Sequence, residues 1–198
     1  MCIRDSIYGG LSFSLRDEAE FQKLAEKIDQ SETISQLRYN QFNSAILRLP
    51  DASVGGLYHK KVLMPFGEYM PLGDIWPELY SLSPHTGNFS AGEESGLFVV
   101  SEEKDKEVLA SMSVCYEDMV PSLARQAVDN SGGEANLLIN LTNDAWYGDS
   151  AAPRQHHLLA LWRAIELRKT FIRSTNTCLL YTSPSPRDAT LSRMPSSA

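Results

Sequence analysis

The feature that most constrains the fold is an alternation of strand-like and helix-like segments in the second half of the chain. Residues 136–141 (NLLINL) form a continuous apolar run, which is typical of a strand buried on both faces. An amphipathic helix is predicted on each side of it, over residues 118–130 and 153–169. This order of elements indicates a layered α/β domain. Further strands are predicted at 97–100, 107–114 and 171–174.

Each predicted helix carries an apolar stripe at helical spacing, which we expect to face the core. The stripes are Leu123, Ala124, Ala127 and Val128 in the first helix, and Leu158, Leu161, Trp162 and Ile165 in the second.

The first half of the chain predicts a strand over 7–13, a surface helix over 16–30, and a hairpin. The hairpin consists of residues 42–49 and a return arm, 57–64, that carries Lys60. Residues 65–95 show little periodicity and much Gly, Pro and Ser, so they are predicted to form a long loop. Because loops of this length are usually functional, we expect this one to lie over a site.

Length and charge exclude several classes of protein. A chain of 198 residues fits one domain with a sizeable core. A formal net charge of −7 argues against nucleic acid as a partner. No apolar run approaches the ~20 residues that span a bilayer. The three cysteines lack the paired spacing of a disulfide framework or a zinc site, and His156 and His157 are adjacent and diverge on a helix, so no metal is expected.

The two ends of the chain differ in character from the rest. Residues 1–6 (MCIRDS) and the Ser- and Pro-rich tail, 178–198, carry no core pattern and resemble adapter-derived sequence. We therefore expect one native region, residues 7–177, in which Cys115 is the single cysteine.

Cys115 is the leading candidate for a catalytic residue. In SVCYED (113–118) it stands between a predicted strand and a predicted helix, where a side chain is presented at the edge of a sheet. A free thiol has a pKa near ~8.5, so a nucleophilic role requires a neighbouring cation or helix N-terminus. The ordinary alternative is a small buried hydrophobe.

Lys60 and Glu68 are the candidate partners of this thiol. Lys60 lies within an apolar run, 54–64, predicted as a strand, where an edge lysine pointing to solvent is the alternative interpretation. Glu68 would ordinarily be a solvated loop acid. Together with Cys115 they can form a set in which an acid takes the thiol proton and an ammonium group stabilises an oxyanion, so acyl transfer through a thioester is predicted.

Three longer motifs carry a family resemblance: YHKKVLMPFGEYMP (58–71), SVCYED (113–118) and LTNDAWYGDSAAPRQHHLLALWRAIELRKTFIRSTNT (141–177). They resemble the carbon–nitrogen hydrolase, or nitrilase-type, domain of the apolipoprotein N-acyltransferase family. The first two suit the whole superfamily, whereas PFGEY, NDAWYGD and RAIELR are more particular to the acyltransferases. The resemblance implies an α/β fold, namely a nitrilase-type α-β-β-α sandwich half-domain with a mixed sheet, incomplete at both ends.

The resemblance also implies roles for individual residues. By alignment on the motifs, Cys115 is the nucleophile and Lys60, not Lys61, is the catalytic lysine. The remaining residues with an implied role near the site or in substrate binding are Glu68, Tyr116, Glu117, Asn143 and Trp146. No metal and no organic cofactor is implied.

One departure from the family pattern is important. The family's general-base glutamate lies upstream of the strand that opens at Ile7, and no such motif is present. Glu78 in Trp76-Pro77-Glu78 has the right letters but follows the lysine, which favours a chance match. The family's N-terminal membrane helices and C-terminal continuation are lacking too. We therefore expect a truncated and inactive piece of the domain.

The function implied is transfer of a phospholipid acyl chain, through a thioester on Cys115, to the diacylglyceryl-cysteine of apolipoproteins. It implies location at the bacterial inner membrane with the catalytic domain facing the periplasm, and membrane contact through segments that this chain does not contain. One alternative is a soluble amidase or nitrilase of the same superfamily. Another is a non-catalytic binding domain on the same fold.

Overall fold

The computed structural model describes residues 6–15, 39–73, 75–76, 78–83, 85–103, 106–176 and 180–183. The chain divides into two compact units. One is built from residues 1–9, 45–58 and 94–198, and the other from residues 10–44 and 59–93. We refer to them as the thiol unit and the lysine unit, because they contain Cys115 and Lys60 respectively.

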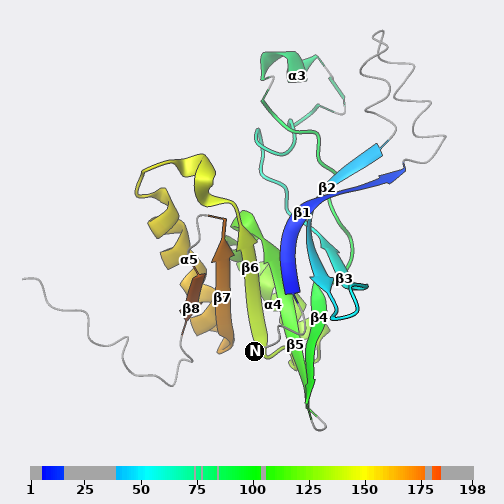
Figure 1. The fold of residues 1–198 in the computed structure, drawn as a ribbon. Helices are drawn as coiled ribbons and strands as arrows, with labels where there is room; N and C mark the ends of the chain where they lie inside the picture. Colours follow the sequence, from blue (N-terminus) through cyan, green and yellow to red (C-terminus); the bar gives the residue numbers. More distant parts are fainter. Residues whose placement is uncertain are drawn as a thin grey trace, which may run out of the picture. The chain divides into compact units, whose positions relative to one another are not determined.

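A three-stranded sheet has the order β1-β2-β3 (Figure 1). Its strands are β1 (Ser6–Leu15), β2 (Tyr39–Arg48) and β3 (Val54–His59). The predictions of strands at 7–13 and 42–49 are confirmed, whereas the helix predicted at 16–30 lies outside the described residues.

The return arm of the hairpin is shorter than predicted. β3 ends at His59, so Lys60 is the first residue after a strand and does not lie inside one. The reason is the side chain of Glu68, which accepts hydrogen bonds from the Lys60 ammonium group at 2.7 Å and from the Met64 amide at 2.8 Å. These contacts fold residues 60–68 into a loop.

A five-stranded mixed sheet has the order β4-β5-β6-β7-β8. Its strands are β4 (Leu97–Glu103), β5 (Lys106–Val114), β6 (Leu137–Thr142), β7 (Thr170–Thr175) and β8 (Leu180–Ser183). β5, β6 and β7 are parallel, and β4 and β8 pair antiparallel at the edges. The predictions of the first four strands are confirmed. β8 lies in the tail, where the sequence predicts no element.

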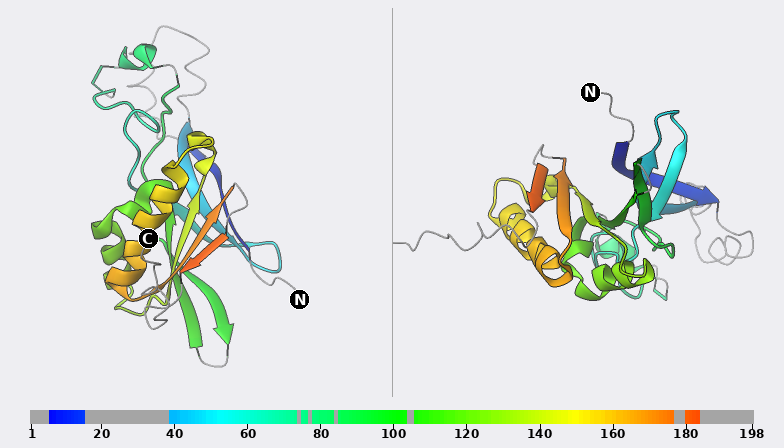
Figure 2. Two further views of the ribbon diagram at one scale, coloured as in Figure 1. Left: turned by 90° about the vertical axis from the view of Figure 1, so that its left-hand side faces the viewer. Right: turned by 90° about the horizontal axis from the view of Figure 1, so that it is seen from below.

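Two helices, α4 (Pro121–Asn130) and α5 (Ala152–Leu167), cover one face of this sheet (Figure 2). Short 3-10 helices follow two of the parallel strands: η1 (Cys115–Met119) after β5 and η2 (Asp144–Tyr147) after β6. A single helical turn, α3 (Leu79–Leu82), interrupts the predicted long loop. The prediction of an α/β fold with a mixed sheet is therefore confirmed.

The central strand β6 is buried on both faces, as its apolar sequence predicts. Ile139 belongs to a core that also contains Ala45, Leu47, Tyr58, Phe98, Ala110, Met112 and Val114. Leu138, its neighbour, points into a second core with Val128, Ala135, Ala160, Ala164 and Phe171. The carboxyl ends of β5 and β6 are consequently fixed in place, and the turns that follow them are the usual position of a site in such a sheet.

The apolar stripe predicted for α5 is wrong. Leu158, Trp162 and Ile165 are 47%, 55% and 48% exposed. Leu161 is half-buried. The buried face consists of His156, Ala160, Arg163 and Ala164. The two alanines let the helix approach the sheet closely, and His156 and Arg163 form ion pairs. The inner face of α5 thus combines the two core alanines with a charged contact from His156 to Asp118, whereas the pair of Arg163 with Glu166 stays within the helix.

On α4 the predicted stripe does face inward, with Val128 buried and its other members half-buried. The helix begins at Pro121 and not at residue 118, because η1 occupies the preceding residues. Among the described residues, no helix has the length and apolar character needed to cross a membrane.

Candidate active site

Cys115 lies at the carboxyl end of β5, where the predicted strand-to-helix turn is confirmed. Its backbone φ is 55°, in the left-handed region that costs a residue with a side chain about 1–3 kcal/mol. Such a conformation persists only where the surrounding structure fixes it. The side chain is half-buried, so the thiol is presented at the edge of the sheet.

Hydrogen bonds fix the backbone on both sides of this residue. The side-chain amide of Asn140 donates to the Cys115 carbonyl oxygen at 2.8 Å. The Val114 amide donates to the carboxylate of Glu117 at 2.8 Å, and the Tyr58 hydroxyl donates to the same carboxylate at 3.0 Å. Glu117 is 1% exposed. It therefore supports the turn that presents the thiol, while a contact of Glu117 with substrate stays a prediction.

The other residues predicted near the thiol differ in exposure. Tyr116 is half-buried. Asn143 is exposed and its side-chain oxygen accepts a hydrogen bond from the Ala145 amide at 3.1 Å, which caps η2. Trp146, also in η2, is 84% exposed. A role of these three residues in lining a substrate pocket stays a prediction.

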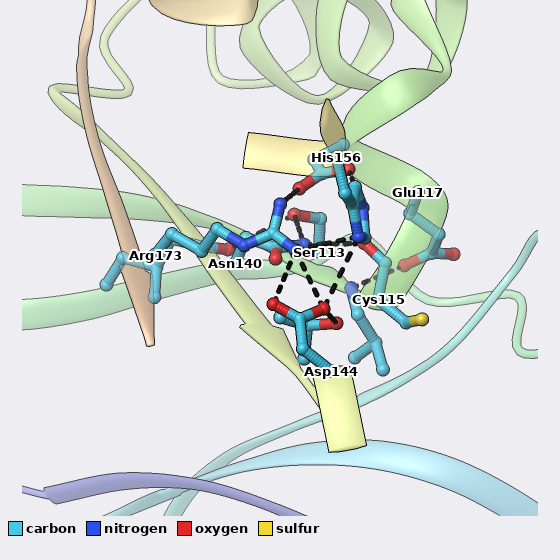
Figure 3. A network of polar contacts seen from close by, with 11 residues as sticks. Ser113, Cys115, Glu117, Asn140, Asp144, His156 and Arg173 are labelled. Atoms are coloured by element: carbon cyan, nitrogen blue, oxygen red, sulfur yellow. Dashed lines mark hydrogen bonds and ion pairs between the residues drawn. The ribbon is translucent and has the colours of Figure 1, made fainter. Parts of the chain in front are cut away.

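Behind Cys115 lies a buried ionic cluster that the sequence analysis missed (Figure 3). We call it the Arg173 cluster; its members are Arg173, Asp118, Asp144 and His156. Arg173 donates to Asp118 at 3.0 Å and to Asp144 at 3.1 Å. His156 Nε2 lies 3.0 Å from Asp118, and its Nδ1 lies 2.7 Å from Arg173 Nη2. All four residues are at most 4% exposed.

One signal in the sequence could have revealed this cluster. Arg173 is a charged residue within an apolar strand, where it needs buried partners of opposite charge. Asp118 and Asp144 each follow a predicted strand, 107–114 and 136–141, within a few residues. His156 was considered only as a metal ligand. Among the described residues, no group of three or more His, Cys, Asp or Glu side chains could hold a metal ion.

Two side chains of the thiol unit, Tyr147 and His157, have shifted pKa values. Burial raises the pKa of Tyr147 above its usual 10.0, and negative charge on Cys115 and then on Asp144 raises this pKa further. Burial lowers the pKa of His157 below its usual 6.5, and the charge of Arg173 lowers it further. The phenol of Tyr147 therefore lies within the electrostatic reach of the thiol.

In the lysine unit, the two candidate partners of the thiol, Lys60 and Glu68, contact each other. The ammonium group of Lys60 lies 2.7 Å from Glu68 Oε2, and Lys60 is 1% exposed. Asn43 donates to the other oxygen of Glu68 at 3.0 Å. The interpretation of Lys60 as an edge lysine pointing to solvent is therefore wrong, because its side chain is buried against a carboxylate. Glu78, the chance match to the family's general base, is exposed.

Each unit thus holds one group whose chemistry bears on acyl transfer. One presents a thiol on a constrained turn, and the other holds a buried ammonium group with its carboxylate. A thiol can form an acyl thioester, and an ammonium group can stabilise the oxyanion that precedes it. The approach of Lys60 to Cys115 stays a prediction.

The sequence matches the model of the carbon–nitrogen hydrolase family over residues 9–191. Among curated proteins it is similar to the apolipoprotein N-acyltransferase of Bdellovibrio bacteriovorus, with 39% identity over 61% of this chain and 21% of that protein. It is also similar to the apolipoprotein N-acyltransferase of Geobacter metallireducens, with 36% identity over 71% of this chain and 25% of that protein. The chain therefore spans about a quarter of the length of these relatives.

Solved structures with a similar fold include Saccharomyces cerevisiae Nit3, a member of the nitrilase superfamily. It shares 19% identity, with a TM-score of 0.45 over 69% of this chain and 39% of that one. An amidase from Nesterenkonia sp. AN1 shares 22% identity, with a TM-score of 0.46 over 69% of this chain and 42% of that one.

Proposed function

Because this chain belongs to the carbon–nitrogen hydrolase family, we propose that it carries the thioester-forming site of an apolipoprotein N-acyltransferase. The observation that carries the proposal is the left-handed Cys115 at the end of a parallel strand, held by Asn140 and Glu117. The names of the relatives, at 36–39% identity, support this reaction over others of the family.

In the first half-reaction the sulfur of Cys115 attacks the ester carbonyl carbon of a phospholipid. A C–S bond forms, the carbonyl oxygen becomes an oxyanion, and the C–O bond to the glycerol breaks. The lysophospholipid leaves with the proton that the thiol lost. Lys60 stabilises the oxyanion, and the carboxylate of Glu68 holds the ammonium group in place, which fits their 2.7 Å contact.

In the second half-reaction the α-amino group of a diacylglyceryl-cysteine attacks the thioester. A C–N bond forms and the C–S bond breaks, so that an amide is released and the thiol is regenerated. The resemblance assigns proton transfer to a general-base glutamate. With these substrates, the reaction takes place at the bacterial inner membrane, on the side facing the periplasm.

A labelling experiment tests the proposal. The chain, expressed with the coding sequence that flanks it, is incubated in membranes with a phospholipid that carries radiolabelled acyl chains. We expect a hydroxylamine-sensitive label on the protein, which is lost in Cys115→Ala and retained in the control Ser122→Ala, at an exposed position of α4. Subsequent addition of a diacylglyceryl-cysteine peptide should transfer the label to the peptide.

Two results would contradict the proposal. Label that persists in Cys115→Ala would exclude a thioester on Cys115. Hydrolysis of a small amide by Cys115, without labelling by phospholipid, would favour the amidase alternative.

A further inference from the structure

The Arg173 cluster surrounds the turn that carries Cys115. Asp118 belongs to η1, which starts at Cys115, and Asp144 belongs to η2 at the end of the adjacent parallel strand. His156 comes from α5 and Arg173 from β7. Three other elements are thereby tied to the turn that follows the thiol.

The contacts of the His156 ring favour one tautomer. An arginine N–H can only donate, so His156 Nδ1 accepts from Arg173 at 2.7 Å. The ring proton is therefore on Nε2, which donates to Asp118 at 3.0 Å. Figure 3 shows Arg173, His156 and Asp144 pointing toward one another, with Cys115 beside them. The donor and the acceptor of each contact are thus assigned: Arg173 donates to His156, and His156 donates to the Asp118 carboxylate.

Stability alone is a weak explanation for this cluster. Buried ion pairs are often no more stabilising than well-packed apolar side chains of similar volume. A residue in the left-handed region, in contrast, needs surroundings that determine its conformation. Arg173 contacts this turn at Asp118, three residues after Cys115, whereas Asn140 donates a hydrogen bond to the Cys115 carbonyl oxygen itself.

We infer that the Arg173 cluster holds the Cys115 turn in its reacting conformation, which makes His156 and Arg173 positioning residues for thioester formation. This inference rests on the proposed function for its chemistry. The structural part, namely that the cluster restrains the turn, stands independently of it.

Hydrogen exchange of single amides in this chain tests the restraint. The reporters are Val114, bonded to the Glu117 carboxylate, and Val120, bonded to the Glu117 carbonyl oxygen. Met112, bonded to Gly96 within the sheet, is the internal reference. His156→Leu should speed exchange at both turn amides about tenfold or more and leave Met112 unchanged.

A conservative variant and a matched control separate positioning from general damage. His156→Gln keeps a donor and an acceptor on one planar group, so both turn amides should stay within about threefold of the wild type. Glu166→Gln changes a pair with Arg163 that stays within the same helix and does not reach the Cys115 turn, so it should change neither reporter.

Turn amides that exchange as in the wild type in His156→Leu would overturn the inference, as would equal acceleration at Met112. If His156→Leu does not fold, Arg173→Lys replaces it with the same expectations, because a lysine keeps the charge but cannot contact both carboxylates and the imidazole. Thioester formation from phospholipid is measured in parallel. If exchange at the turn amides responds to His156→Leu but the wild-type protein forms no thioester, only the proposed function is refuted. If His156→Leu forms the thioester at the wild-type rate, only the inference is refuted.

Discussion

Replacing Tyr58 with phenylalanine removes one hydroxyl group from a buried carboxylate beside the thiol. The hydroxyl donates to both oxygens of Glu117, at 3.1 and 3.0 Å, and neither residue is more than 2% exposed. A hydrogen bond to a charged group contributes about 1.5–3 kcal/mol. No other heavy atom changes, so we expect Tyr58→Phe to lower the free energy of unfolding by about 2 kcal/mol.

Calorimetric unfolding measures this effect. In a chain of this length, 1 kcal/mol corresponds to about 2–4 °C, so the midpoint should fall by about 4–8 °C. Tyr39→Phe is the matched control, because Tyr39 is 47% exposed and its hydroxyl bonds to no residue that the structure describes. Its effect should stay within about 0.5 kcal/mol. Equal midpoints for the two variants would refute the role of Glu117 as a buried support of the turn.

Three further outcomes are expected. Glu68→Gln should slow formation of the thioester about 100-fold in single-turnover labelling, because the ammonium group of Lys60 loses the charge that holds it; an unchanged rate would contradict this. Asn140→Leu should cost about 1–3 kcal/mol in urea unfolding and slow the same reaction, because the Cys115 carbonyl oxygen loses its donor; wild-type stability and rate would contradict it. Burial, and then the charge of Arg173, lower the pKa of His157 from its usual 6.5, so as the pH falls the unfolded chain takes up this proton before the folded chain does, and the contribution of His157 to stability is lost below about pH 6.5. His157→Gln should therefore lose less thermal stability than the wild type on acidification. Parallel curves of unfolding midpoint against pH for the two proteins would exclude this effect.

Local patterns in the sequence predicted most elements of the fold. The apolar run at 136–141 and the two flanking helices are set by contacts close in sequence, and Cys115 stands at the predicted strand end. Lys60 and Glu68, which the sequence indicated as candidate partners of Cys115, contact each other because a short loop closes their eight-residue separation.

Long-range charge pairing explains what the sequence analysis missed. Arg173 contacts Asp118, which lies 55 residues away, and such pairing leaves no periodic signal. On α5, His156 belongs to the same cluster and is buried, whereas Trp162 is 55% exposed although its spacing predicted burial. Hydrophobic periodicity cannot detect a helix that is oriented by a buried histidine. Lys60 and Cys115 belong to separate units, so the local sequence around either residue does not determine the distance between them.

The proposed chemistry depends on the ammonium group of Lys60, which stabilises the oxyanion formed at Cys115. A crystal structure of the protein with an acyl group trapped on Cys115 measures this directly. We expect Lys60 Nζ to lie about 3 Å from the thioester carbonyl oxygen, and a separation of about 6 Å or more, with other side chains between them, would contradict the proposed role of Lys60.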